Sequence, residues 1–435
     1  MFRSWSDAPG GRGVRRVLAA GICIAGSIAA LAHAQSTTLS LEAQVGQQLF
    51  FDTNLSASRQ MACATCHDPG NHYAQPTTNT RPVQYGGANL TTPGIRAVPT
   101  LTYKEYIQPY DDDAPNPDGV SSNAPGGGFT WDGRADTLAQ QVSIPLLTSY
   151  EMDNSSEAAV VAVVQNASYA ALFEQAFGTS VFSNTATAFT DIGLALQQYQ
   201  LEDSSFHPFT SKYDYVTTLE LSNGQPVTFT AAENRGYTVF NYTGNCFACH
   251  YNGPMVGGGG AMFTDFTYEV AAAPRNPAIP ANATKIGLPT YYDLGLCTAV
   301  NPDPVNPYLI PHVLPASASL CGNFKVPTLR NTATRNVFFH NGVFTTLAQV
   351  VDFYNTRDTD PSKWYPTVNG VVQLYNDLPT AYKANVDVTD LPFGLPAGAT
   401  PYLTPQNEAD LVCFMETLTD GYVQGVTPQD PNCIN

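Results

Sequence analysis

The stretch Cys63-Ala64-Thr65-Cys66-His67 decides how this chain is interpreted, and Cys246-Phe247-Ala248-Cys249-His250 repeats its pattern 183 positions later. Two cysteines separated by two residues and followed directly by histidine are typical of covalent c-type haem attachment. The two thiols bond to the vinyl groups of the porphyrin, and the adjacent histidine becomes the proximal ligand of the iron. The sequence therefore predicts two haem c groups, with His67 and His250 as proximal iron ligands.

A Cys-x-x-Cys pair also occurs in thioredoxin-like redox motifs and in zinc sites. Neither alternative explains why a histidine follows both pairs in a chain that has only seven histidines. Haem attachment through Cys63, Cys66, Cys246 and Cys249 is therefore the preferred interpretation.

The N-terminus has the features of an export signal. A basic segment with Arg12, Arg15 and Arg16 precedes the apolar residues 17–32, and Ala32-His33-Ala34 matches a small-residue cleavage site. We expect residues 1–34 to be a signal peptide that is removed after export. The mature chain should then be periplasmic, and no later stretch is long and apolar enough to predict a membrane span.

The composition is acidic. The formal charge is −17, and removing the four Arg and one Asp of the signal peptide takes it to −20. Such a charge argues against a nucleic-acid partner and suits a basic one.

About 400 residues after the signal predict two domains, and two haem motifs fit that number. We place an N-terminal haem domain at 35–225 and a C-terminal haem domain at 226–435. Apolar spacing and capping residues predict a mainly α fold with two cytochrome c-like haem domains and long irregular loops. Helices are expected near 41–50, 137–147, 156–177, 191–201, 230–240, 346–354 and 405–418.

Four cysteines stay unassigned once Cys23 leaves with the signal and four hold haem: Cys297, Cys321, Cys413 and Cys433. In an oxidising compartment an even number of cysteines indicates disulfides. Pairing within each close couple is the simplest of three connectivities, and buried free thiols are the alternative.

Several separate motifs resemble the bacterial di-haem cytochrome c peroxidase and MauG superfamily. The likeness extends from about Leu41 to Thr419. The motifs that carry it are Leu49-Phe50-Phe51-Asp52, Cys66-His67-Asp68-Pro69, Trp131-Asp132-Gly133-Arg134, Phe324-Lys325-Val326-Pro327-Thr328-Leu329-Arg330-Asn331 and Phe339-His340-Asn341-Gly342.

The resemblance implies that the N-terminal haem reacts with hydrogen peroxide and that the C-terminal haem stores or relays electrons. It places Trp131 between the haems as a relay, with structural packing on a haem as the alternative. Gln141 and Glu151 have the spacing of the family's distal pair. Glu151 is the candidate acid–base group and Gln141 orients peroxide or water. A surface or helix-start acid is the alternative for Glu151.

This sequence departs from the family's pattern at two positions that would supply the remaining iron ligands. Many relatives supply a histidine to the first haem from a loop that matches residues 85–89, where this chain has none. Fourteen residues after His340, where the peroxidases place a methionine, this chain has Tyr354. A phenolate ligand donates charge and stabilises high oxidation states of iron. The alternative is an ordinary buried Tyr354, with Met255 or Met262 as the ligand of the second haem.

The resemblance also suggests calcium between the domains. The position of the family's asparagine ligand is Ala97 here, and Arg335 and Val337 offer only backbone carbonyls. Because calcium requires several oxygen ligands, these residues favour it weakly.

The leading expectation is an exported di-haem c-type oxidoreductase. It reduces hydrogen peroxide at the N-terminal haem with electrons relayed through the C-terminal haem from a small redox protein. The first alternative is MauG-like, peroxide-dependent oxidation of Trp or Tyr in a protein substrate. The second is a non-catalytic di-haem electron carrier.

Overall fold

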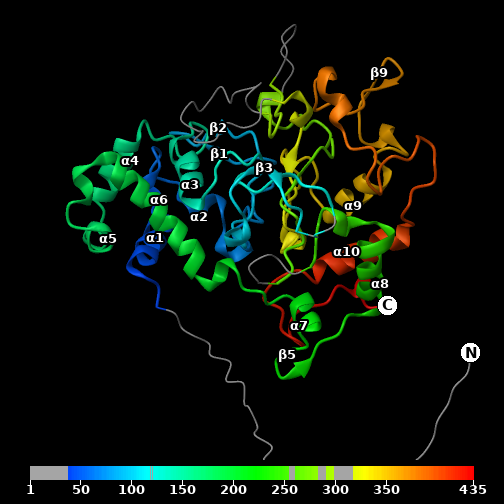
Figure 1. Ribbon diagram of the computed structural model, residues 1–435, viewed down its shortest axis with the longest axis horizontal. Coiled ribbons are helices and arrows are strands. Elements are labelled where there is room, and N and C mark those ends of the chain that lie inside the picture. Colours follow the sequence, from blue (N-terminus) through cyan, green and yellow to red (C-terminus); the bar gives the residue numbers. More distant parts are fainter. Residues whose placement is uncertain (1–37, 118, 120, 254–259, 283–290, 298–316) are drawn as a thin grey trace, which may run out of the picture. The chain divides into compact units, whose positions relative to one another are not determined.

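Helices supply most of the regular structure (Figure 1), as the sequence predicted. The computed structural model describes residues 38–117, 119, 121–253, 260–282, 291–297 and 317–435. The predicted signal peptide 1–34 and Met255 therefore lie outside the described residues. Within them, no helix is both long and apolar enough to cross a membrane. The α-helices described are α1 (Leu41–Phe51), α2 (Cys63–Cys66), α3 (Leu138–Leu147), α4 (Glu157–Gln165), α5 (Ala170–Phe177), α6 (Thr185–Glu202), α7 (Lys212–Thr218), α8 (Ala231–Thr238), α9 (Leu347–Thr356) and α10 (Pro405–Glu416).

The strands are short and pair two by two in antiparallel fashion. The pairs are β1 (Tyr85–Gly86) with β2 (Thr92–Pro93), β3 (Asp111–Ala114) with β4 (Ala124–Gly126), β5 (Leu221–Ser222) with β6 (Gln225–Pro226), β7 (Tyr268–Glu269) with β8 (Phe324–Lys325), and β9 (Thr367–Val368) with β10 (Val371–Val372).

Capping side chains set where the helices begin. The Ser40 hydroxyl accepts the Ala43 N–H at 3.1 Å and starts α1. Thr230 and Glu233 form the predicted capping box of α8. The single helix predicted over 156–177 is wrong, because the chain turns between α4 and α5. Asn166 ends α4 there, and its side-chain amide donates to the Ala162 carbonyl at 2.7 Å.

Two hydrophobic cores each adjoin one haem motif. In the first half of the chain, α1, α3 and α4 pack on the long helix α6. Cys63 contacts the core that these helices bury, which includes Val45, Leu49, Phe50, Val160, Phe173, Ile192, Ala195 and Leu196. In the second half, α8 and α9 pack on α10. Cys246 contacts that second core, which includes Val239, Phe240, Phe263, Val351, Leu411, Phe414 and Leu418.

A glycine lets two helices approach closely in each half. A Cβ on Gly46 of α1 would overlap the Ala195 carbonyl oxygen of α6. A Cβ on Gly236 of α8 would overlap the Asp410 carbonyl oxygen of α10 in the same way. Both halves therefore place a glycine-mediated helix crossing beside a Cys-x-x-Cys-His motif.

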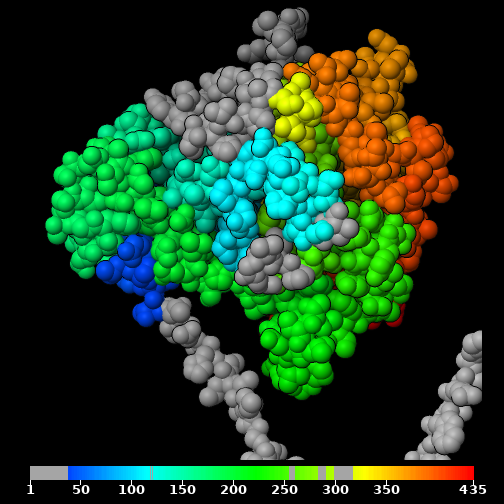
Figure 2. All heavy atoms as spheres, viewed as in Figure 1, coloured from blue at the N-terminus to red at the C-terminus, as the bar shows by residue number. Residues whose placement is uncertain are grey.

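Loop segments join the two halves. Ala97 donates its N–H to the His340 carbonyl at 2.7 Å, and Lys325 donates to the Trp131 carbonyl at 2.9 Å. On the face shown in Figure 2, residues near 85–130 lie between the helices of the first half and later segments of the chain. The domain boundary at residue 225 stays a prediction.

Both predicted disulfides are present. Cys297 pairs with Cys321, and Cys413 pairs with Cys433. The second bridge ties α10 to the C-terminal residues. Cys63, Cys66, Cys246 and Cys249 form no disulfide, which leaves all four motif thiols available for attachment.

Replacing Gly236 by alanine tests the close helix crossing. Alanine is more favourable than glycine in a helix by about 1 kcal/mol. Here, however, its methyl group would push α8 away from α10. We expect Gly236→Ala to lower the free energy of unfolding by about 1–3 kcal/mol, as overpacking does. Gly46→Ala should do the same in the other half. Thermal unfolding of both variants measures the effect, and an unchanged or raised Tm would contradict the close approach.

Candidate functional site

The first motif forms one helical turn that orients its histidine. The His67 N–H donates to the Cys63 carbonyl at 2.9 Å, which closes the turn. The His67 Nδ1 lies 3.1 Å from the Tyr73 carbonyl oxygen. Because a carbonyl only accepts, Nδ1 carries the hydrogen and Nε2 keeps a lone pair for a metal. Burial lowers the pKa of His67 to about 4, so the ring is neutral at pH 7.

The second motif repeats this arrangement on a 3-10 turn, Cys246–Ala248. The His250 N–H donates to the Cys246 carbonyl at 2.9 Å, and the His250 Nδ1 lies 3.0 Å from the Phe263 carbonyl oxygen. Burial likewise lowers the pKa of His250 to about 4. Each motif therefore presents a neutral imidazole whose Nε2 is available as a ligand.

One cavity of about 470 Å³ brings the site residues together. All ten residues proposed from the sequence line it: Cys63, Cys66, His67, Trp131, Gln141, Glu151, Cys246, Cys249, His250 and Tyr354. Residues more than 200 positions apart thus face a common space. The catalytic and ligand roles expected for these residues stay predictions.

Trp131 is fixed from both sides. Its indole N–H donates to the Ala97 carbonyl at 2.9 Å, and its own carbonyl accepts the N–H of Lys325 in β8. These bonds hold the indole at the cavity between a loop of the first half and a strand of the second.

Gln141 and Glu151 come from two elements that meet at the first motif. Gln141 lies on α3, which Thr137 caps. Glu151 lies in the turn after α3, where its N–H donates to the Thr148 carbonyl and its carbonyl accepts from Gly87. The charge of Glu151 contributes to raising the pKa of Cys66, after burial, to about 12. The Glu151 carboxylate therefore lies near the first attachment site.

Tyr354 lies on α9 and faces the second motif. Its ring stacks on Phe339 at 5.8 Å and on Phe393 at 5.3 Å between centroids. Burial raises the pKa of Tyr354 above its ordinary value, and the charges of Cys249 and Cys246 add to the shift. The hydroxyl is thus close to the second attachment site, and only a strong partner such as a metal would keep it ionised.

Histidines other than His67 and His250 offer little to the cavity. Of the described residues, His340 is the remaining histidine in the lining. Its ring stacks on Phe324 at 3.6 Å between centroids. The loop at 85–89 does not line the cavity, because the backbone of Tyr150 and Glu151 lies against Gly86.

Comparison with known proteins identifies the family. A family model described as di-haem cytochrome c peroxidase matches residues 40–220. The methylamine utilization protein MauG of Paracoccus denitrificans strain Pd 1222 is 33% identical over 383 residues, which cover 87% of this chain and 88% of MauG. The chain belongs to the di-haem cytochrome c peroxidase and MauG family. It is accordingly an enzyme of the di-haem peroxidase type.

Further relatives agree with this assignment. The diheme peroxidase BthA from Burkholderia thailandensis E264 is 35% identical in its crystal structure, with a TM-score of 0.74 over 90% of this chain and 89% of BthA. The cytochrome c551 peroxidase of Nitrosomonas europaea is 26% identical over 71% of each chain.

The two motifs of this di-haem enzyme fit haem. Each provides two free thiols and a histidine with a fixed, neutral ring, and both line the same largely apolar cavity. Each motif therefore suits the attachment of one haem, whose iron would be bound by Nε2 of His67 or His250.

Calcium does not fit the residues suggested for it. The Ala97 side chain is a methyl group and carries no oxygen atom for a cation. The Arg335 guanidinium donates to the Val337 carbonyl at 3.3 Å and to the Val98 carbonyl at 2.9 Å. A cationic side chain thus already occupies the Val337 carbonyl, one of the two carbonyls suggested for calcium, which binds through several oxygen atoms.

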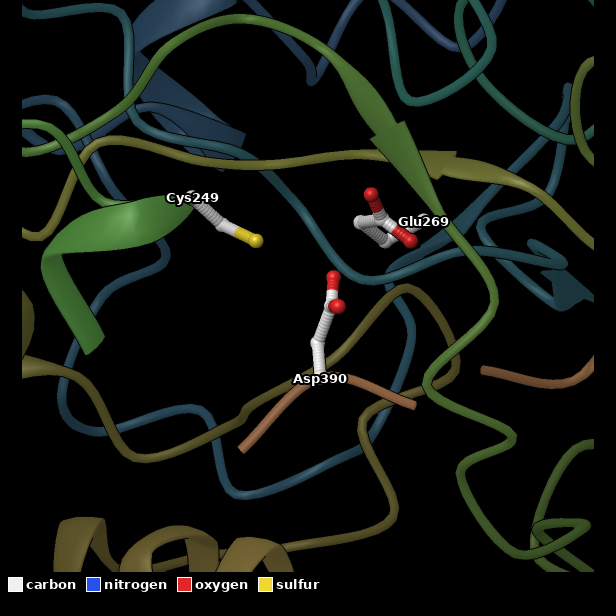
Figure 3. A group of neighbouring side chains, drawn as sticks. All are labelled: Cys249, Glu269 and Asp390. Atoms are coloured by element: carbon white, nitrogen blue, oxygen red, sulfur yellow. The ribbon is translucent and has the colours of Figure 1, made fainter. Parts of the chain in front are cut away.

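Acidic side chains gather around Cys249 (Figure 3). Its sulfur and one carboxylate oxygen each of Glu269 and Asp390 lie within 4.8 Å of one another. Once the thiol is consumed by haem attachment, the sulfur is a thioether and the trio loses its strongest metal ligand. We therefore interpret Glu269 and Asp390 as acidic side chains beside the second attachment site and not as a metal site.

Sequence reasoning missed several cavity residues. Lys104, Lys325 and Arg335 line the cavity together with Arg96 and Arg134. A signal was available for two of them, because Arg134 lies inside the motif Trp131–Arg134 and Lys325 inside the motif Phe324–Asn331, and both motifs carried the resemblance. The other basic residues lie outside any periodic pattern.

Glu269 makes stability depend on pH. Burial, aided by Asp387 and Asp390, raises its pKa from 4.5 to about 8. The folded chain holds this proton up to about pH 8, whereas the unfolded chain releases it near pH 4.5, so the contribution of Glu269 to stability falls as pH rises between these values. Glu269→Gln should therefore weaken the fall in Tm between pH 5 and pH 8. Exposed Glu220→Gln is the control, and an unaltered pH profile in Glu269→Gln would contradict the assignment.

Proposed function

We propose that this chain is an exported, periplasmic enzyme with two covalently bound haem c groups. It reduces hydrogen peroxide at the haem attached to Cys63 and Cys66, and electrons reach that haem through the one attached to Cys246 and Cys249. The observation that supports this most is the single cavity lined by both motifs, Trp131, Gln141 and Glu151. A haem iron, when bound, supplies the site for peroxide and the path for electrons.

Reduction of one hydrogen peroxide to two waters consumes two protons and two electrons. Glu151 takes the proton from one peroxide oxygen and returns it to the departing oxygen, which is general acid–base work for a carboxylate beside an apolar face. Gln141 orients peroxide or water through its amide. Trp131, held by the Ala97 carbonyl, provides an oxidisable ring between the two attachment sites.

His67 and His250 would hold the two haem irons through Nε2, and Tyr354 would supply a further ligand to the iron of the C-terminal haem. Support for this role comes from the place of Tyr354, buried and close to Cys249 and Cys246. A phenolate there lowers the potential of the haem relative to a methionine ligand and favours its oxidised states.

The electron source is a small redox protein with a basic surface, which the acidic composition of this chain favours. A second candidate function is MauG-like oxidation of Trp or Tyr in a protein substrate. Tyr354 and the lack of a further ligating histidine in the described cavity lining favour it. The carrier alternative fits less well, because two of the relatives named above are peroxidases.

Substitution of Glu151 tests the acid–base proposal. Glu151→Gln should retain both haems and slow peroxide turnover by about a hundredfold, because general acid–base catalysis contributes at least that factor. Stopped-flow kinetics of peroxide consumption measures the effect. Glu157→Gln, an exposed acid at the start of α4, is the matched control. Turnover of Glu151→Gln equal to the wild type would remove Glu151 from the mechanism.

Rapid mixing of the fully ferric protein with one equivalent of hydrogen peroxide separates the two functions. An absorption change within milliseconds is expected if the first haem is open and Tyr354 helps the protein hold oxidising equivalents. Tyr354→Phe should then alter the spectrum of the second haem and shorten the lifetime of the oxidised protein. A response that appears only after the second haem is reduced would favour the donor-dependent peroxidase, and an unaltered Tyr354→Phe spectrum would disprove ligation.

A further inference from the structure

Three basic side chains line the cavity without a carboxylate partner. Lys104 belongs to the 3-10 turn Lys104–Tyr106, Lys325 to β8, and Arg335 follows the 3-10 turn Thr332–Thr334. Among the residues that the structure describes, no carboxylate forms an ion pair with any of them. Arg335 donates only to backbone carbonyls, those of Val98 and Val337.

Neighbouring carboxylates are already neutralised. Asp132 pairs with Arg134 and lies 2.9 Å from Arg96, and Arg96 also pairs with Asp293 at 2.6 Å. These two acids and two bases carry no net charge together. Glu105, next to Lys104 in the chain, instead faces His207 Nδ1 at 3.5 Å.

Of the three basic residues, Lys325 gives the strongest indication of an anionic ligand. The residue is 7% exposed, and its Nζ has no hydrogen-bond partner among the described residues. The Tyr268 ring lies beneath it, with 5.5 Å between Nζ and the centroid. A buried ammonium with no acceptor costs several kcal/mol. Such a side chain in a cavity lining indicates an anionic ligand that the protein chain itself does not provide.

The position of this group points to the first haem. Arg335 donates to the Val98 carbonyl at 2.9 Å. The same loop continues to Leu101, whose N–H donates to the Tyr73 carbonyl that also contacts the His67 Nδ1, and Lys104 follows three residues later. Lys325 joins the loop of the first half through its backbone N–H, which donates to the Trp131 carbonyl. Haem carries two propionate side chains, which are carboxylates at pH 7. Charge-assisted hydrogen bonds from lysine and arginine to carboxylates are the strong kind in a buried site.

We propose that Lys104, Lys325 and Arg335 bind the propionate groups of the haem attached at Cys63 and Cys66. The proposal rests on the proposed function only in requiring that haem. It assigns these three residues to cofactor binding and to the control of redox potential. A cation beside the haem disfavours the ferric state, which carries one more positive charge, and so raises the midpoint potential.

The test is spectroelectrochemical titration of each haem in Lys325→Met, a variant of similar length without the charge. The ferric-to-ferrous ratio of the first haem at a given applied potential should rise about tenfold, a 59 mV decrease in midpoint potential. Lys325→Arg should restore most of the wild-type value. Lys383→Met removes the same charge at a residue outside the cavity lining and should leave both potentials unchanged.

Two results would overturn the proposal. One is an unchanged potential of the first haem in Lys325→Met with both haems attached. The other is an equal shift in Lys383→Met. If Lys325→Met does not fold, Lys104→Met takes its place, with the same expected direction and the same overturning result. Haem content from the pyridine haemochrome spectrum is measured separately, so a wild-type protein lacking two haems would refute the proposed function and not the role of Lys325 alone.

Discussion

The hydrogen bond from a histidine Nδ1 to a backbone carbonyl is the contact on which the site depends. His67 makes it to Tyr73 and His250 makes it to Phe263. In each case the bond fixes the tautomer and restrains the ring, and it leaves Nε2 with a lone pair for a metal. The carbonyl partners lie six and thirteen residues beyond the histidines, in loops that are held by the two hydrophobic cores. Core packing therefore sets the direction of the two metal ligands.

Features of the structure that depend on neighbouring residues could be predicted from the sequence. The haem motifs, the capping residues Ser40 and Thr230, and the two disulfides depend on neighbouring residues and were predictable from them. The helix predicted over 156–177 failed because apolar spacing continues through a turn. Asn166 breaks that helix with a side-chain hydrogen bond, and such local competition leaves no trace in the hydrophobic pattern.

The sequence did not reveal which site residues, far apart along the chain, lie close together in space. Trp131, Gln141, Glu151 and Tyr354 were proposed from the family resemblance, and their convergence on one cavity needed the fold. The basic residues were missed for a physical reason. Whether a lysine or arginine is neutralised depends on partners far along the chain, as with Arg96 and Asp293, which are 197 positions apart. The ion pairs of the folded structure are needed to identify the basic side chains that have no carboxylate partner.

The two disulfides constrain the order in which this protein can be assembled. All four of their cysteines follow both Cys-x-x-Cys-His motifs in the chain, so the motif thiols would emerge first in the proposed export from the N-terminus. Thiolates exchange readily with disulfides. If haem is attached to these thiols after export, as proposed, maturation requires a reductant that keeps Cys63, Cys66, Cys246 and Cys249 as thiols until haem arrives, in the same compartment where an oxidant closes the later bridges. On that proposal, a cell that produces this enzyme needs a thiol reductant and a disulfide-forming oxidant at the same time and in the same compartment.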